Sequence, residues 1–263
     1  MSKVYQIHVD TSSTNNSQTN ISGGTNSMVT PNRITYPSVN KQFNNPFDCT
    51  VILGQTHRRL RRVSLKCAEI PIAFSNIRQP YNVIKIGGTT YTIPTGNYTI
   101  STLITALNTT ITATVGSFSY NAGTSKIVFT SAAGSVTLNN TVTGTNLPNL
   151  LYFIGFTDGQ AGSVITSTNA YMINFDTYIS IYIPNLRNSS QEPSFITFKI
   201  PVTVANGGIQ YFAERAQFSQ ELEIYDRMIM FDRLDIQVRD RFGQMLNNLG
   251  VDWSFTIEIE SDT

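Results

Sequence analysis

Charged side chains are scarce in this chain of 263 residues. It has 18 lysines and arginines and 17 aspartates and glutamates, so the formal net charge is +1 and charged residues make up 13%. That is about half the share usual in globular proteins. Non-specific nucleic-acid binding is driven by a basic electrostatic field. The nearly neutral balance therefore removes the usual argument for such binding by the chain as a whole.

Long hydrophobic runs are also missing. No stretch approaches the roughly 18 apolar residues that indicate a transmembrane helix, so we expect no membrane span. Residues 1–8 lack the apolar core of a secretory signal peptide. The two cysteines, Cys49 and Cys67, are too few for a disulfide scaffold. We expect a soluble chain, rich in threonine, asparagine and serine, that is made inside a cell.

Residues for catalysis and metal binding are equally few. The only histidines are His8 and His57, and His57 lies in the polar segment 54–59, which we interpret as a solvated turn. A structural zinc site needs four nitrogen or sulfur ligands at short spacings, and the chain does not offer them. We interpret both cysteines as small buried side chains on strands. The sequence therefore predicts no enzyme activity, no cofactor and no metal.

Alternation of apolar and polar residues is the main positive signal. It predicts about eight strands, with Val63, Leu65 and Cys67 on one face of the second, a turn at Gly54-Gln55, and a hairpin turn at Asn206-Gly207-Gly208. Such alternation is typical of antiparallel strands with one wet face. Packing them with few exposed edges predicts a mainly β fold, a single jelly-roll β-sandwich. The predicted strands cover residues 47–53, 60–74, 173–183, 195–204, 209–215, 220–225, 234–239 and 253–259.

A different pattern over residues 81–171 predicts an inserted α+β domain. It contains two short hairpins, over 83–93 and 118–130, the second of which is extended by 136–138. A helix follows a cap at Thr99 or Ser101, and residues 149–156 form a further helical turn. The surrounding jelly roll is then discontinuous, over 47–80 and 172–263.

The first 46 residues are interpreted as a flexible N-terminal arm. Residues 10–32 contain too few apolar side chains to offset the entropy of ordering them. Either the arm is a tail without a task, or it orders against a neighbouring subunit. Tyr5, Ile7 and Val9 fall on one face of a segment that could add a strand to a sheet edge elsewhere.

The sharpest local charge feature is the cluster Arg58, Arg59, Arg61 and Arg62. Guanidinium groups suit phosphate, carboxylate or a nucleic-acid backbone. One hypothesis is a contact between subunits or with phosphate, for instance with packaged genome; the other is a solvated loop that binds an acidic neighbour. A second charged segment mixes carboxylates with arginines, for which we predict mutual pairing rather than a calcium site or a catalytic pair. Its carboxylates are Glu221, Glu223, Asp226, Asp232, Asp235 and Asp240, and its arginines are Arg215, Arg227, Arg233, Arg239 and Arg241.

Four segments carry a resemblance to a known family. Residues 234–243 and 249–259 look like the closing strands of small capsid proteins in large DNA viruses, virophages and related elements. Residues 91–107 and 151–156 are similar to an inserted module found in some of those proteins. Over about residues 47–260 the chain resembles the penton family, single jelly rolls that form pentamers at icosahedral vertices. The shared pattern consists of turns and aromatic residues and contains no catalytic signature.

The resemblance implies a structural protein of the virion capsid that is assembled in the infected host cell. It implies a homo-pentamer at each vertex, with major capsid protein trimers as partners and the arm as a clamp beneath the shell. A minor capsid or tail-fibre protein could share the pattern. A second hypothesis is a head that binds a host receptor or glycan, and a third is a carbohydrate-active enzyme on the same scaffold, because fold alone does not decide function. The tyrosines that could stack on sugars are Tyr81, Tyr91, Tyr98, Tyr120, Tyr171, Tyr178 and Tyr182.

Overall fold

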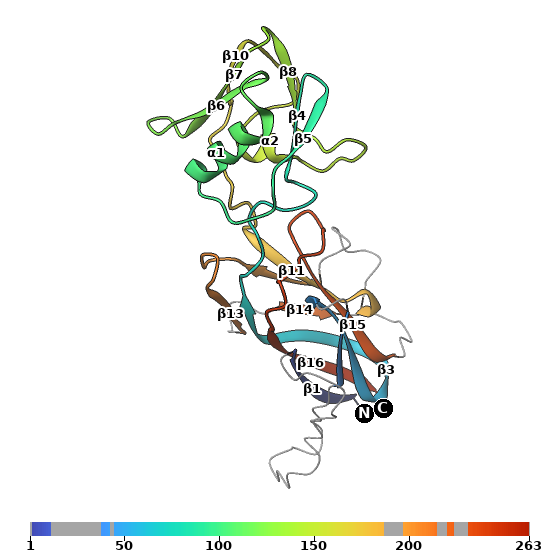
Figure 1. Ribbon diagram of the computed structural model, residues 1–263. Coiled ribbons are helices and arrows are strands. Elements are labelled where there is room, and N and C mark those ends of the chain that lie inside the picture. The colour runs from blue at the N-terminus through green and yellow to red at the C-terminus, as the bar shows by residue number, and fades with distance from the viewer. Residues whose placement is uncertain are drawn as a thin grey trace. The chain divides into compact units, whose positions relative to one another are not determined.

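The computed structural model describes residues 2–11, 38–42, 45–186, 197–214, 220–223 and 231–262. The chain divides into two compact units. The sandwich unit combines Met1–Phe74 with Asp176–Thr263, and the inserted unit is Ser75–Phe175 (Figure 1). The inserted unit begins and ends a few residues outside the predicted range of 81–171, because Ile77 and Ile173 belong to its hydrophobic core.

The sandwich unit is one antiparallel sheet folded over along a single long strand, β3. The C-terminal half of β3 pairs with β16, β13 and β14, and β16 pairs in turn with β1. The N-terminal half pairs with β2 and β15, followed by β11 and β12. Figure 1 shows β3 as a long, curved ribbon. The elements of this unit are β1 (Ser2–Asp10), β2 (Ser38–Gln42), β3 (Asn45–Pro71), β11 (Tyr178–Tyr182), η1 (Pro184–Leu186), β12 (Phe198–Pro201), β13 (Ile209–Ala213), β14 (Gln220–Glu223), β15 (Phe231–Arg239) and β16 (Ser254–Asp262).

Both halves of the folded sheet contribute to one hydrophobic core. Val51 of the N-terminal half of β3, Val63 of its C-terminal half, Ile236 of β15 and Ile257 of β16 are all fully buried in it. Two sheet layers around a shared core form a β-sandwich. The prediction of a mainly β fold is thus confirmed.

The predicted turn at Gly54-Gln55 is wrong, because β3 runs without interruption through both residues. A strand that is shared by two packed layers must bend from one to the other. The first half of β3 therefore lies in one layer and its second half in the other. Sequence alternation showed two strand segments, but not that the chain continues as a strand between them.

The predicted common face for Val63, Leu65 and Cys67 is also wrong. Leu65 pairs with Ile257, but the next pair in the ladder joins Cys67 to Thr256. Lys66 is therefore the extra residue of a β-bulge, and one extra residue reverses the alternation that follows. Val63 and Leu65 are buried, whereas Cys67 is exposed.

The Asn206-Gly207-Gly208 segment forms a turn, in which the Gly208 amide donates to the Ala205 carbonyl at 3.0 Å. The strands on either side do not form the predicted hairpin. β12 pairs with β11, whereas β13 pairs with β3. The turn therefore carries the chain from one layer of the sandwich to the other.

Part of the predicted flexible arm over 1–46 is a strand of the sandwich. β1 pairs along its whole length with β16 of the same chain. Tyr5, Ile7 and Val9 are at most 2% exposed, so their shared face is buried in the chain's own core. The Thr11 hydroxyl donates to the Asp252 carboxylate at 3.1 Å. Within the rest of the predicted arm, β2 is also a strand, and residues 12–37 lie outside the described residues.

The inserted unit has its own core, two small sheets and two helices. Its two sheets have the strand orders β5-β4-β8-β9 and β10-β7-β6. The predicted hairpins are confirmed as β4–β5 and β6–β7, but β8 pairs with β4 instead of extending the second hairpin. The elements are β4 (Val83–Ile86), β5 (Thr89–Thr92), α1 (Ile100–Ile111), β6 (Gly116–Asn121), β7 (Lys126–Ser131), β8 (Val136–Asn139), α2 (Leu150–Phe153), β9 (Gln160–Gly162) and β10 (Val164–Thr166).

The helix α1 begins where the sequence predicts. The Thr99 hydroxyl accepts a hydrogen bond from the Thr102 amide, and the Thr102 hydroxyl accepts one from the Thr99 amide. This reciprocal capping satisfies two backbone donors at the helix start. Leu103 and Leu107 are fully buried, so the apolar face of α1 packs into the core of the inserted unit. The second predicted helical turn is confirmed as α2, with Asn149 as its N-cap.

Candidate assembly surface and binding residues

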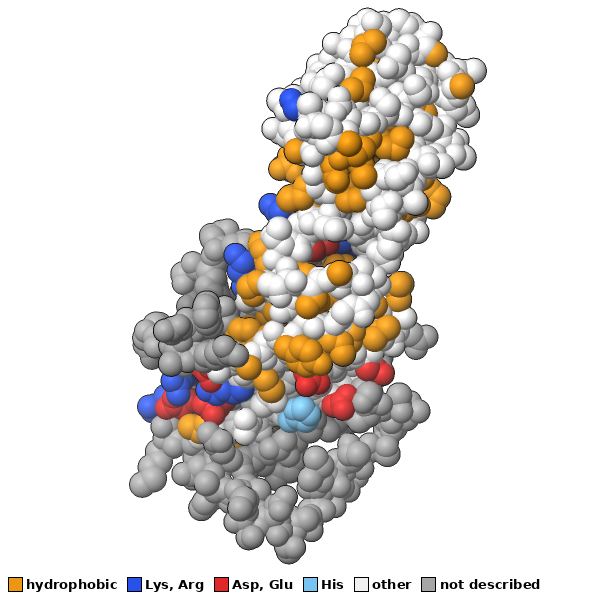
Figure 2. Space-filling view, turned by 90° about the vertical axis from the view of Figure 1, so that its left-hand side faces the viewer, with side chains coloured by type: hydrophobic (Ala, Val, Ile, Leu, Met, Phe, Trp, Pro, Cys, Tyr) orange, Lys and Arg blue, Asp and Glu red, His pale blue; other side chains and the backbone are white. Residues whose placement is uncertain are grey.

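The two units differ in the character of their surfaces. Figure 2 shows most of the acidic and basic side chains of the visible face on the sandwich unit, whereas the inserted unit is almost entirely white and orange. The candidate sites therefore separate into charged groups on the sandwich and neutral groups on the insert.

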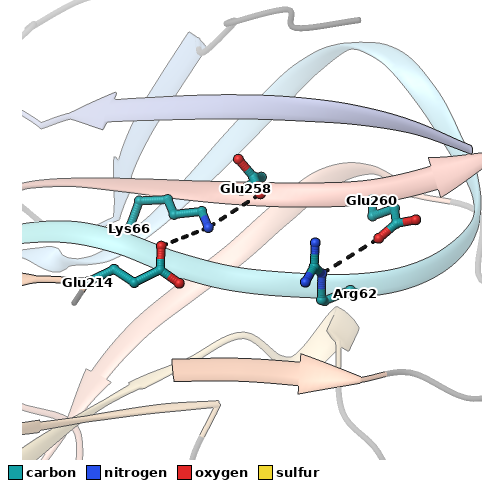
Figure 3. Close-up of polar contacts among 5 residues, drawn as sticks. All are labelled: Arg62, Lys66, Glu214, Glu258 and Glu260. Atoms are coloured by element: carbon teal, nitrogen blue, oxygen red, sulfur yellow. Dashed lines mark ion pairs between the residues drawn. The ribbon is translucent and has the colours of Figure 1, made fainter. Parts of the chain in front are cut away.

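The arginine cluster lies on β3 rather than in a loop. Arg58, Arg59 and Arg61 are exposed. Arg62 is half-buried, and its Nε lies 3.6 Å from the Glu260 carboxylate of the neighbouring strand β16 (Figure 3). Arg59 has a left-handed backbone with φ of 48°. The structure therefore places four guanidinium groups along one strand, and Arg62 forms an ion pair within the chain.

His57 is not in a solvated turn, as the sequence indicated, but is 4% exposed on β3. Its Nδ1 lies 3.1 Å from the Ser261 hydroxyl, and its ring meets the Tyr5 ring edge-on at a centroid distance of 4.5 Å. Burial disfavours the charged imidazolium. It therefore lowers the pKa of His57 below its ordinary value of 6.5.

Lys66, the bulge residue, connects two strands through carboxylates. Its Nζ lies 2.7 Å from Glu214 and 3.3 Å from Glu258, as Figure 3 shows. Partial burial tends to lower the pKa of Lys66, but the hydrogen bonds and negative charges of Glu214 and Glu258 together outweigh it, so this pKa lies above its ordinary value. The two carboxylates thus hold the bulged backbone to both of its neighbouring strands.

The second charged segment shows pairing and turn capping. Arg233 lies 3.6 Å from Asp235. Asp240 is fully buried, and its carboxylate accepts hydrogen bonds from the Phe242 and Gln244 amides. Asp226, Arg215 and Arg227 lie outside the described residues, and the side chains of Glu221 and Glu223 are not described. Across the described ranges, no group of three or more histidine, cysteine or acidic residues could hold a metal ion.

The seven tyrosines proposed to stack on sugars occupy different environments. Tyr81 is 1% exposed and belongs to the interior. The Lys199 ammonium covers the Tyr178 ring at 4.2 Å, and the Arg239 guanidinium covers the Tyr182 ring at 4.5 Å. Tyr91 and Tyr98 are half-buried. Tyr120 and Tyr171 are partly exposed and contact one another.

An apolar sheet edge is the feature that sequence reasoning missed. On β13, Ile209 is 44% exposed and Tyr211 is 64% exposed, whereas Phe212 packs against the core. β13 pairs with β3 along one edge, and no strand among the described residues pairs with its other edge. The alternation of residues 209–215 could have indicated this outward row, but only the structure shows that β13 ends the sheet.

The part of the chain that the structure describes contains no helix long and apolar enough to cross a membrane. No family model and no curated protein matches the sequence. The chain is similar to the mavirus penton protein in a solved crystal structure, with a TM-score of 0.43 and 12% sequence identity. The likeness covers 86% of this chain and 98% of that chain.

Proposed function

We propose that this chain is a structural capsid protein, a penton whose sandwich unit is a single jelly roll and which forms homo-pentamers at the vertices of an icosahedral virion. Its partners in this proposal are the surrounding major capsid protein trimers. The support is the sequence resemblance over residues 47–260 together with a surface suited to self-assembly. The observation that carries the assembly proposal is the apolar edge at β13.

The outward face of β13 continues onto the strand beside it. Tyr211 pairs in register with Glu69, and Ala213 pairs with Cys67. All four residues are exposed, as is Ile209 at the start of the strand. The result is a mixed apolar and polar row along a sheet edge, which we call the β13 edge.

Such an edge is a liability in a free monomer. An unpaired strand presents backbone donors and acceptors that a second chain can pair with, and natural proteins commonly protect it with lysine or proline. On β13 the exposed positions are instead Ile209, Tyr211 and Ala213. Contact between the β13 edge of one copy and a different surface of the next is a heterologous interface, which closes into a ring when the rotation permits.

Charged groups lie at one end of the apolar row. Lys66 and Glu214 lie directly beyond Ala213, since the Glu214 amide donates to the Lys66 carbonyl at 2.8 Å. A polar rim around an apolar centre is the usual anatomy of a protein interface. The exposed arginines Arg58, Arg59 and Arg61 are proposed as a second contact, with a neighbouring subunit or with phosphate.

The test places a lysine on the apolar edge. The variants Ile209→Lys and Tyr211→Lys are compared with Val164→Lys, a matched control on the inserted unit, where Val164 is 62% exposed. We expect light scattering to show the single-chain mass for the two edge variants, and the assembled mass for the control and for the unmodified chain. Far-UV circular dichroism checks that every variant is folded.

Two outcomes would contradict this proposal. One is an unmodified chain that stays monomeric at all concentrations and is absent from purified particles. The other is folded edge variants that assemble as well as the control.

A further inference from the structure

The inserted unit is almost uncharged. Among residues 75–175 the only charged side chains are Arg78, Lys85, Lys126 and Asp158, against 31 in the rest of the chain. Arg78 is 8% exposed, and its guanidinium lies over the Phe175 ring. The surface of this unit is therefore left to threonine, serine, asparagine and aromatic side chains (Figure 2).

Two tyrosines form an aromatic corner on this neutral surface. The Tyr120 and Tyr171 rings lie 5.4 Å apart at an interplanar angle of 84°. A hydrogen bond with Tyr120, partial desolvation and the charge of Tyr120 each raise the pKa of Tyr171. The Tyr171 hydroxyl is therefore neutral at physiological pH, and the two rings meet edge to face.

The backbone around Tyr171 is anchored to the rest of the inserted unit. The Tyr171 ring packs against the core of this unit, and the amide of the next residue, Met172, donates to the Phe153 carbonyl at 2.7 Å. We call the pair Tyr120 and Tyr171 the tyrosine patch. Tyr152, which is 49% exposed on α2, is not part of it.

Uncharged hydrogen-bonding groups lie beside the patch. The Tyr171 amide donates to the Ser125 carbonyl, which brings the turn between β6 and β7 against Tyr171. Thr124 of this turn is exposed. Lys126 alternates with the buried Ile127 on β7, and Ile127 pairs with Tyr120, so Lys126 falls on the opposite face of the ladder from Tyr120.

We infer that the tyrosine patch binds a neutral glycan. A pyranose ring has an apolar C–H face that stacks on a tyrosine ring, and hydroxyls that pair with amide and hydroxyl groups at its rim. Tyrosine suits this task because it joins a large rigid surface to a polar tip. An acidic saccharide would instead require arginine or lysine partners, which this face of the inserted unit lacks. This binding is separate from the proposed capsid function.

The test uses the full chain and neutral tetrasaccharides built from glucose, mannose, galactose or N-acetylglucosamine. Saturation-transfer NMR detects binding, and a titration gives the Kd. We expect at least one of these probes to bind, and Tyr171→Ala to weaken binding by about tenfold or more, which corresponds to about 1.4 kcal/mol. The matched control is Tyr152→Ala, which removes an exposed tyrosine of the same unit outside the patch and should leave the Kd within about twofold.

A second variant guards against a folding defect. If Tyr171→Ala perturbs the amide spectrum of the inserted unit, Tyr120→Ala is used instead, because Tyr120 supplies the other ring of the patch. The proposal is overturned if no neutral probe binds at millimolar concentration, if only sialylated or sulfated comparison probes bind, or if folded patch variants bind as the unmodified chain does. If Tyr171→Ala forms the same oligomer as the unmodified chain, its loss of glycan binding is independent of the proposed capsid function.

Discussion

At the scale of single residues, burial decides the chemistry of the titratable groups. His57 is packed between the Tyr5 ring and the Ser261 hydroxyl, which favours its neutral form. Lys66 keeps its charge because Glu214 and Glu258 lie within ion-pair distance. His57 joins three strands, β1, β3 and β16, so its protonation is coupled to the stability of the sandwich.

We predict that acid destabilises the fold partly through His57. Its pKa in the folded chain lies below the ordinary value of 6.5, so below about pH 6.5 the unfolded chain takes up a proton that the folded chain does not. The free energy of unfolding therefore decreases as the pH falls, until the pH reaches the folded-state pKa. Urea unfolding of His57→Gln between pH 7 and pH 5 should show a weaker pH dependence than the unmodified chain. His8→Gln, at an exposed histidine, is the matched control; an unchanged slope in His57→Gln would contradict the prediction.

At the scale of elements, local signals were predictable and non-local ones were not. Helix α1 and its cap at Thr99 depend on residues a few positions apart, as does the β4–β5 hairpin, and both were found from the sequence. The bulge at Lys66 depends on how β3 meets β16, almost two hundred residues away. Likewise, β13 pairs with β3, which is distant in the sequence, and not with the strand that precedes the turn. The burial of His57 was missed for the same reason, because β1 and β16 supply its surroundings.

The bulge at Lys66 predicts which of the two cysteines reacts with a thiol reagent. Because it reverses the alternation of β3, Cys67 is exposed while Cys49 is 1% exposed. A thiol reagent should therefore label one cysteine in the folded chain and two after unfolding. The variant Cys67→Ser should leave no rapidly labelled thiol, whereas Cys49→Ser should leave one. Rapid labelling of Cys49, or protection of Cys67 in the folded single chain, would show that the register of β3 is different.

At the scale of the whole molecule, the described residues form two hydrophobic cores that share no residue. Leu107 is fully buried in the core of the inserted unit, and Val51 is fully buried in that of the sandwich. The sequence predicts a separate unit over residues 81–171, because the periodicity and composition change there. The bending of the sheet along β3 was not predicted, because no local sequence pattern indicates which strands share a layer.

Two cores predict two separate unfolding transitions. Leu107→Ala leaves a cavity and should cost about 2–5 kcal/mol, and calorimetry should show that only one transition moves to lower temperature. Val51→Ala should move the other transition and leave the first in place. A single transition that shifts with both substitutions would show that the two units unfold as one.

We propose that the chain works by assembling with copies of itself into a ring of five. Native mass spectrometry of the purified full chain counts the copies directly. We expect a dominant species of five chains, each of 29.2 kDa. A chain that remains single at every concentration tested, or a closed assembly of three, would contradict it.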